Sequence, residues 1–277
     1  MGSTALVMHP AGISRRNRDF VERLHRQGTA FDVPRASETL GLDPDKTRRL
    51  LGYLARRGWL ARVRRGLYVP VPLDARRSGE WREDSWVVAE LLFSPCYIGG
   101  WSACEHWGLT EQVFRTVVAI TAAGLHKRDV EIQGIRFHLT KRAESKLFGT
   151  VLVWRDQSKI HVSDATRTII DVLDDPKLAG GIRSAADVLY EYMSSEHRND
   201  DLLIEYGDRL GNRAVFKRLG YLLEHGAIHA PQLIAACLKR RSSGLSRLDP
   251  SIQTAGKIVR RWSLRINATV GPPGGEG

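Results

Sequence analysis

The sequence is poor in cysteine and has no long apolar run, and each absence removes a class of protein. Its three cysteines include no CxxC pair, so neither a disulfide framework nor a zinc ribbon is indicated. No uncharged apolar stretch reaches about 18 residues, and the first apolar run lacks the layout of a signal peptide. We therefore expect a cytoplasmic protein with no membrane contact, in which Cys96, Cys104 and Cys237 are small buried hydrophobic residues.

Motifs for the common catalytic chemistries are missing as well. The chain has no Walker-type phosphate loop, no glycine fingerprint of dinucleotide sites, no HExxH and no glycine-flanked nucleophilic serine. Cys104 and His106 are too few to indicate a metal site. The densest carboxylate group, Asp171, Asp174 and Asp175, ends a predicted helix, whereas two-metal enzymes place such residues around a strand. We expect no enzyme, no metal and no cofactor; an enzyme that acts on nucleic acid through Asp171 and Asp174 is the alternative.

The net charge of +11 is unevenly distributed along the 277 residues. Residues 1–77 hold 16 Lys and Arg against 7 Asp and Glu, a net charge of +9. Residues 78–238 hold 18 against 22, a net charge of −4, and residues 239–277 hold 8 against 2, a net charge of +6. This distribution indicates a head that binds a polyanion and a body with another task.

The most basic part of the head, residues 33–71, combines two short helix patterns with an arginine-rich hairpin. Asp32 is the predicted cap of a helix that ends at Gly41, where glycine suits a positive φ. Asp43 begins a second helix, which Gly58 stops. The apolar period then changes to about two, which is typical of strands at 59–63 and 67–71 joined by Arg64, Arg65 and Gly66.

The second helix of this segment is amphipathic. Its apolar stripe holds Thr47, Leu50, Leu51 and Leu54, and the opposite face is basic. On that face Gly52 costs about 0.5 to 1 kcal/mol relative to Ala, which favours close approach to a partner, the alternative being a surface glycine without a role. The predicted DNA-binding residues of the head are Arg15, Arg16, Lys46, Thr47, Arg48, Arg49, Tyr53, Arg56, Arg62, Arg64 and Arg65.

These residues divide between two kinds of contact. The helix face is expected to enter the major groove, and the arginines of the hairpin are expected at phosphates or in the minor groove. A charge cluster that only keeps the surface solvated is the alternative reading. The coincidence of helix spacing and hairpin favours DNA binding.

The fold class predicted from these patterns is α+β. A first helix at 14–27, capped by Ser14, completes a winged helix-turn-helix domain at 1–73, and the polar residues at about 73–80 form a linker. A mixed α+β domain with a helix-rich second half is expected at 80–267, and its final strand, 262–267, is expected to return to the sheet. Residues 268–277 are predicted to be a disordered tail.

Aromatic and histidine side chains of the body are expected to fill its core. They are Trp86, Tyr97, Trp101, Trp107 and Trp154, with His106, His138 and His161 as partly buried, hydrogen-bonded histidines.

Four blocks of the body resemble, in order and spacing, the AbiEi antitoxin family. They are YIGGWSACEHWGLTEQV at 97–113, LFGTVLVW at 147–154, IHVSDATRTIIDVLDDPKLAGGI at 160–182 and LGNRAVFKRLGYLLE at 210–224. In the head, ARRGWLARVRRGLY is similar to the wing pattern of that family. The resemblance covers residues 14–267 and is most specific in the last two blocks. GGWSACEHWGL departs from the family pattern, which has a serine or threonine and a leucine before the histidine.

The resemblance implies a two-part protein of an abortive infection system. Its winged head would bind inverted repeats in the promoter of its own operon and repress transcription. Its body would counteract a cognate nucleotidyltransferase toxin similar to AbiEii, with or without a stable complex. We expect a monomer in solution that binds double-stranded operator DNA cooperatively. The alternative function is a ligand-responsive or dimeric winged-helix regulator with no toxin partner.

The basic C-terminal segment, residues 239–265, has no assigned role in this scheme. Three roles are open for its charges. They extend the surface that binds DNA, they bind a tRNA or an acidic toxin surface, or they are simply solvated. The basic residues in question are Lys239, Arg240, Arg241, Arg260 and Arg261.

Overall fold

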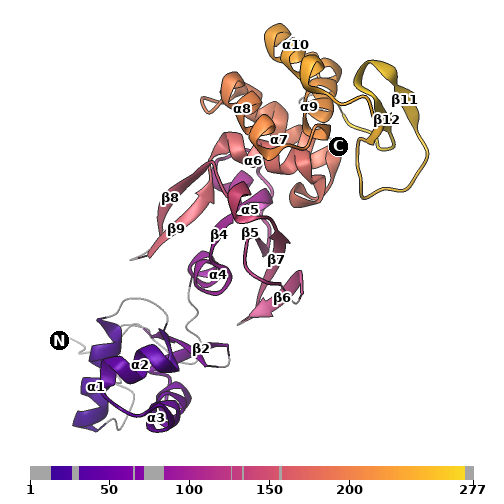
Figure 1. Ribbon diagram of the computed structural model, residues 1–277. Coiled ribbons are helices and arrows are strands. Elements are labelled where there is room, and N and C mark those ends of the chain that lie inside the picture. Colours follow the sequence, from indigo (N-terminus) through magenta and orange to yellow (C-terminus); the bar gives the residue numbers. More distant parts are fainter. Residues whose placement is uncertain are drawn as a thin grey trace, which may run out of the picture. The chain divides into compact units, whose positions relative to one another are not determined.

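The computed structural model describes residues 14–26, 31–64, 66–71, 84–125, 127–132, 134–155 and 158–271 (Figure 1). Contacts divide the chain into two compact units, essentially residues 1–84 and residues 85–277, which we call the N-terminal and C-terminal units. Helices and sheets occur in both, so the α+β class is confirmed. The predicted linker, Arg65 and the side chain of Arg64 lie outside the described residues. No helix in the described part is long and apolar enough to cross a membrane.

Three helices of the N-terminal unit begin at the residues that the sequence predicts. They are α1 (Arg15–His25), α2 (Val33–Leu40) and α3 (Pro44–Arg56). The side chains of Ser14, Asp32 and Asp43 each accept a hydrogen bond from the backbone amide three residues later, which satisfies an orphan donor of the first turn. Gly41 ends α2 with φ at 65°, as expected for a left-handed cap.

A small antiparallel sheet completes this unit. Its strands, β1 (Phe31–Asp32), β2 (Leu60–Arg64) and β3 (Leu67–Pro70), lie in the order β1-β3-β2. The hairpin of β2 and β3 was expected; β1 was not, because two residues are too short to carry a period. The core between helices and sheet consists mainly of Phe20, Val21, Leu24, Phe31, Ala36, Leu40, Leu51, Leu54, Leu60 and Tyr68.

The C-terminal unit contains a mixed six-stranded sheet in the order β6-β7-β5-β4-β9-β8. The central β5 runs parallel to β7 and antiparallel to β4, and β4 runs parallel to β9. Helices α4 (Ser85–Phe93) and α5 (Gly100–His106) pack against the middle of the sheet. The strands are β4 (Cys96–Ile98), β5 (Thr116–Thr121), β6 (Asp129–Ile132), β7 (Ile135–Lys141), β8 (Thr150–Arg155) and β9 (Ser158–Ser163).

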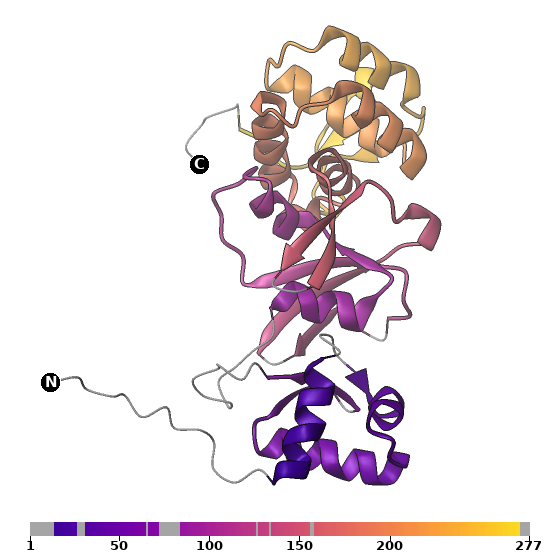
Figure 2. The same cartoon turned by 90° about the vertical axis from the view of Figure 1, so that its left-hand side faces the viewer.

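Helices form the other half of this unit and lie together beyond one end of the sheet (Figure 2). The first of them, α6, packs against α5, α7, α8 and α9 and is therefore the link between the sheet and the helices. The helices are α6 (Ala165–Asp174), α7 (Ile182–Ser194), α8 (Asp200–Leu210), α9 (Ala214–His225) and α10 (Pro231–Arg240).

The predicted return of the last strand to the main sheet is wrong. Strand β12 (Leu264–Ile266) instead pairs with β10 (Ser246–Arg247) and β11 (Lys257–Val259) in a separate small sheet. The reason is Trp262, which is fully buried against α9 and donates its indole N–H to Glu224 Oε2 over 2.7 Å. This anchor keeps the end of the chain beside the helices.

Three further expectations need correction. Val270 is buried, and its carbonyl lies 3.0 Å from His225 Nε2, so the chain is packed beyond residue 268; residues 272–277 lie outside the described part. Trp154 is 62% exposed and does not fill the core. His161 is an exposed residue on β9, because its side chain faces Glu90 at the surface. The three cysteines are buried and free, as expected.

Two helical glycines allow a matched test of this packing. A Cβ at Gly220 would lie 1.9 Å from the Trp262 ring, whereas a Cβ at Gly52 would meet nothing closer than Arg56 Nη1 at 3.8 Å. Gly220→Ala should therefore cost about 1–3 kcal/mol of unfolding free energy through overpacking. Gly52→Ala should stabilise its unit by about 0.5–1 kcal/mol. Denaturant titration measures both, and equal effects of the two substitutions would contradict the prediction.

Candidate nucleic-acid interface

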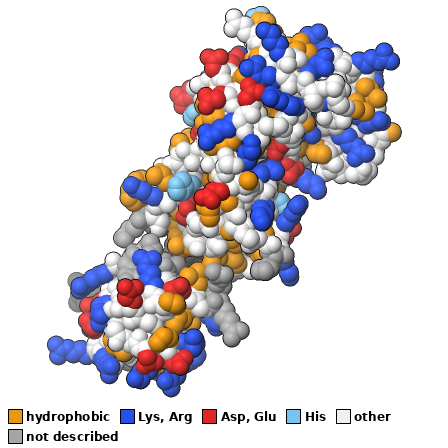
Figure 3. Space-filling view, viewed as in Figure 1, with side chains coloured by type: hydrophobic (Ala, Val, Ile, Leu, Met, Phe, Trp, Pro, Cys, Tyr) orange, Lys and Arg blue, Asp and Glu red, His pale blue; other side chains and the backbone are white. Residues whose placement is uncertain are grey.

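The face of α3 that the helical projection predicts to be basic is at the surface. Lys46, Arg48, Arg49 and Arg56 are exposed, and Tyr53 is half-buried with the guanidinium of a neighbouring arginine 5.7 Å from its ring centre. Gly52 lies among them, and a Cβ there would make an ordinary van der Waals contact with Arg56 Nη1 at 3.8 Å. Figure 3 shows Lys and Arg side chains gathered on the visible face of the N-terminal unit, with a few carboxylates between them.

Two of these cations are held by carboxylates of the same helix. Lys46 Nζ lies 3.0 Å from Asp43 Oδ2, and Arg48 Nη1 lies 2.7 Å from Asp45 Oδ1. The backbone amide of Lys46 is the main cause that lowers the pKa of Asp43, so this cap remains ionised near neutral pH. Exposed pairs of this kind contribute about 0–1 kcal/mol. A phosphate can therefore replace the carboxylates at little cost.

Thr47 does not belong to this face, and its predicted contact with DNA is wrong. The residue is completely buried, because it precedes Leu51 and Leu54 by four and seven positions and so lies on the same stripe of the helix. Its hydroxyl is buried with no hydrogen-bond partner among the described residues. The helical period had already placed Thr47 on the apolar stripe, and the structure confirms that position.

A cleft of about 470 Å³ joins α3 to the hairpin. Arg48 of α3 and Arg62 of β2 both line it, so two residues predicted from separate elements meet at one surface. Tyr68, which the sequence did not indicate, lies opposite Arg62 in the strand register and forms part of the same wall. The alternation of the hairpin could have revealed this pairing. The remaining lining residues are Asp32, Val33, Pro34 and Gly66.

The other predicted residues of the head lie away from this cleft. Arg15 and Arg16 are exposed on α1, where Arg15 lines a separate surface hollow and Arg16 lies 5.5 Å from the ring centre of Phe20. Arg56, in the last turn of α3, does not line the cleft either. The described residues thus unite Arg48 and Arg62 but leave the α1 arginines as a separate group.

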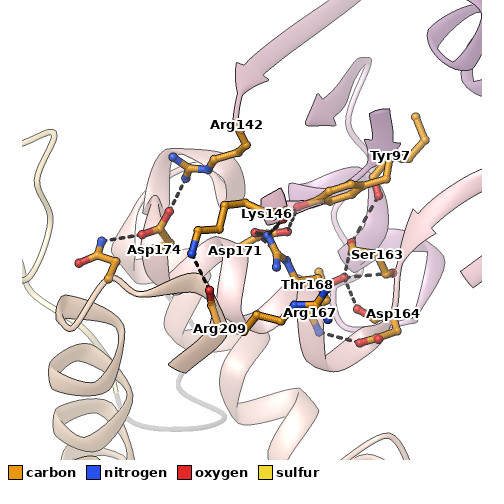
Figure 4. A network of polar contacts seen from close by, with 12 residues as sticks. Tyr97, Arg142, Lys146, Ser163, Asp164, Arg167, Thr168, Asp171, Asp174 and Arg209 are labelled. Carbon is orange, nitrogen blue, oxygen red and sulfur yellow. Dashed lines mark hydrogen bonds and ion pairs between the residues drawn. The ribbon is translucent and has the colours of Figure 1, made fainter. Parts of the chain in front are cut away.

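The carboxylates suggested as an alternative catalytic group lie in a buried polar network of the C-terminal unit (Figure 4). Arg167 Nε donates to Asp171 Oδ1 over 3.1 Å, and Tyr97 donates its hydroxyl to Asp171 Oδ2 over 2.9 Å. The same hydroxyl accepts a hydrogen bond from Arg167 Nη2 at 2.9 Å. Burial raises the pKa of Asp171, and the charge of Arg167 opposes this shift. Both carboxylate oxygens of Asp171 therefore accept hydrogen bonds, one from Arg167 and one from Tyr97.

Neighbouring residues extend this network to the surface of the helices. Asp174 forms an ion pair with Arg142 and accepts a hydrogen bond from Asn212 Nδ2 over 2.6 Å. The guanidinium of Arg167 lies 4.0 Å from the ring centre of Phe148. Among the described residues, no group of three or more His, Cys, Asp or Glu could hold a metal ion. The aspartates act as partners of arginine in this conformation.

A second buried cation, Arg218 of α9, donates hydrogen bonds to backbone carbonyls of the described residues. It donates to the carbonyl oxygens of Leu173 and Asp174 at the end of α6 and to those of Arg247 and Leu248 beside β10. Burial lowers the pKa of this guanidinium, and nearby carboxylates oppose the shift. Arg218 therefore connects the small sheet of β10, β11 and β12 to the helices of the C-terminal unit.

The basic C-terminal segment is partly neutralised. Arg240 Nε lies 2.7 Å from Asp208 Oδ2, and Arg261 Nε lies 2.8 Å from Glu224 Oε1. Lys239 and Arg260 are exposed, and Arg241 is half-buried. These charges do not gather on one element.

Neither the family models nor the curated proteins contain a match to this chain.

The buried pair makes a direct prediction about stability. Asp171→Asn keeps the shape of the side chain but leaves the Arg167 charge buried without its counter-ion, which should cost about 3–5 kcal/mol of unfolding free energy. Glu191→Gln, on the exposed side of α7, removes one carboxylate charge at the surface and should change stability by less than about 0.5 kcal/mol. Chemical denaturation followed by tryptophan fluorescence measures both. A cost for Asp171→Asn no larger than that of the control would refute the role assigned to the pair.

Proposed function

We propose that the chain is an autorepressing antitoxin of the AbiEi type, in which the N-terminal unit is a winged helix-turn-helix that binds operator DNA. The body counteracts a nucleotidyltransferase toxin. The first half of this proposal rests on geometry and charge, and the second half rests on the resemblance of the body.

The observation that carries the DNA-binding proposal is the cleft shared by Arg48 and Arg62. A recognition helix and a wing must present their cations to the same stretch of duplex, one to the groove and the other to the backbone beside it. Arg48 on α3 and Arg62 on β2 line one surface, and Lys46 and Arg49 are further exposed cations of α3. Arginine at the wing can bind phosphate or enter a narrow minor groove.

The ion pairs on α3 support the same conclusion. An arginine that contacts a base must be able to leave its ion-pair partner when DNA binds. Asp45 holds Arg48 at 2.7 Å, yet the two side chains are 80% and 63% exposed, so water screens the pair. Guanine or phosphate then competes successfully for the guanidinium.

The test is operator binding by single variants. Arg48→Ala should weaken the affinity about tenfold or more, because a bidentate contact to a base contributes about 1–3 kcal/mol. Arg62→Ala should also weaken it, because the wing loses a contact to phosphate or to the minor groove. Arg183→Ala, at an exposed arginine of α7, is the matched control and should bind normally. Fluorescence anisotropy with the promoter DNA upstream of the gene gives the affinities. If the control weakened binding as much as the head variants, the contact would not be local to α3 and β2.

Salt dependence adds an independent readout. Each lost phosphate contact should reduce the slope of log K against log salt by about 0.9. A variant that loses a base contact keeps the slope and instead loses discrimination between operator and unrelated DNA. An affinity of the unmodified protein that did not vary with salt would overturn the proposal.

The antitoxin half of the proposal concerns the C-terminal unit. The blocks that resemble the family, 160–182 and 210–224, contain Arg167, Asp171 and Arg218, which hold this unit together. A variant that damages this network should therefore damage antitoxicity without touching the residues of the DNA cleft.

Co-expression with the neighbouring toxin gene separates the two activities. Full-length protein with Arg48→Ala should still rescue growth, because the body is intact, while its operator binding falls. Asp171→Asn should lose rescue, because the destabilised body is depleted, and Glu191→Gln should rescue normally. Growth curves, with protein levels checked by immunoblot, measure the outcome. Loss of rescue by Arg48→Ala at normal protein level would place the antitoxic function in the head instead.

A ligand-responsive regulator remains the second candidate because of a cleft in the C-terminal unit. This cleft has a volume of about 540 Å³, and its walls include Glu90, Glu144 and Thr150. Within it, the ring nitrogen Nδ1 of His161 lies 3.1 Å from Glu90 Oε1. A metabolite that copurifies with the protein and releases it from DNA would favour this function over the antitoxin.

A further inference from the structure

The two edges of the six-stranded sheet differ in how they are protected. At one end, β6 carries exposed Asp129 and Glu131, and charged side chains on an edge strand discourage another strand from pairing with it. At the other end, β8 reads TVLVWR: among its six residues it has no carboxylate, lysine or proline, and only its last residue is charged. In the described part of the chain, β9 is the only strand beside it.

The side chains of β8 are also unusually apolar for a surface strand. Val151, Leu152 and Trp154 are 37%, 53% and 62% exposed, and they are half of the six exposed large hydrophobic residues in the described part of the chain. Exposed hydrophobic side chains that are scattered singly need no explanation, whereas several on one unprotected edge indicate an interaction surface. The sheet thus has one guarded edge and one open edge.

We infer that β8 is a self-association edge, on which a second copy of this chain adds its own β8 in the antiparallel direction. The closed symmetry of a dimer requires the two strands to run antiparallel about a two-fold axis. An axis at Leu152 makes the pairing self-complementary, because residues opposite each other then point to the same face of the sheet: Leu152 lies opposite Leu152 of the second copy, Val151 opposite Val153, and Thr150 opposite Trp154. Pairs of an aromatic and a β-branched residue, and of aliphatic residues, are favourable across antiparallel strands.

The charges at the two ends of β8 favour the same arrangement. The cleft with Glu90 and Glu144 adjoins Thr150 at the beginning of the strand. Arg155 ends the strand, and Lys159 lies near that end, with its Nζ 4.9 Å from the ring centre of Trp154. Antiparallel pairing brings the acidic end of one copy to the basic end of the other, whereas parallel pairing would place like charges together.

The charge pattern favours a second copy over an unrelated peptide, because β8 itself has both the acidic end and the basic end that antiparallel pairing brings together. The association differs from the monomer that the sequence favours, and it does not depend on the N-terminal unit binding DNA. If that unit does bind inverted repeats, a two-fold dimer matches the symmetry of the DNA.

The experiment measures mass against concentration in the absence of DNA. Sedimentation equilibrium of the full chain should give a mass that rises from 31.1 kDa towards twice that value. Leu152→Lys places a charge in the middle of the open edge and should raise the dissociation constant about tenfold or more, equivalent to about 1.4 kcal/mol. Ile258→Lys is the matched control: Ile258 is 45% exposed on β11, which is also an edge strand, and its replacement should leave the dissociation constant unchanged.

Hydrogen exchange locates the contact. The backbone amides of β8 should exchange more slowly at high protein concentration, while those of β6 should not change. A mass of one chain at every concentration would overturn the inference, and so would a dimer that Leu152→Lys does not weaken. If the protein forms the dimer but does not bind operator DNA, the proposed DNA contacts are contradicted and this inference is not.

Discussion

The C-terminal unit depends on one buried ion pair, Arg167 with Asp171. Each charge would cost several kcal/mol in the core without its partner, and the two lie one helical turn apart on α6, so a single helix supplies both. The hydroxyl of Tyr97 joins the pair from β4 and thereby ties the sheet to the helices. Arg218, further along the chain, is a buried cation that also connects separate elements, but its partners are backbone carbonyls at the end of α6 and beside β10.

This arrangement changes the meaning of the family resemblance. The blocks at 160–182 and 210–224 are its most specific part, and in this chain they contain the buried charged residues Arg167, Asp171 and Arg218. Similarity in such blocks reflects what the fold requires, because a buried cation tolerates few substitutions. Contacts with a toxin, if they are made, must involve residues outside the network. The exposed surface of the unit, including β8 and the basic C-terminal segment, is the part that remains free to differ.

Local signals were readable from the sequence, and contacts between distant segments were not. Asp32 and Asp43 revealed where α2 and α3 begin, because a cap binds an amide only three residues away. The helical period placed Thr47 on the apolar stripe, where it is buried, and its inclusion among the DNA-binding residues disregarded that position. The course of the last strand depends on Trp262 against Gly220, a contact that no local period encodes. The sequence did not show that Arg48 and Arg62 line the same cleft, because this depends on how the hairpin folds against α3.

The same pairing of arginine with aspartate serves two purposes in the two units, and the surroundings decide which. In Arg167 and Asp171 the side chains are 0% and 1% exposed, so separation would leave bare charges in a medium of low dielectric. In Arg48 and Asp45 water screens both partners, and separation costs little. The buried pair therefore holds structure, whereas the exposed pair contributes little to stability and can separate easily. Chemical type alone does not distinguish the two, but burial does.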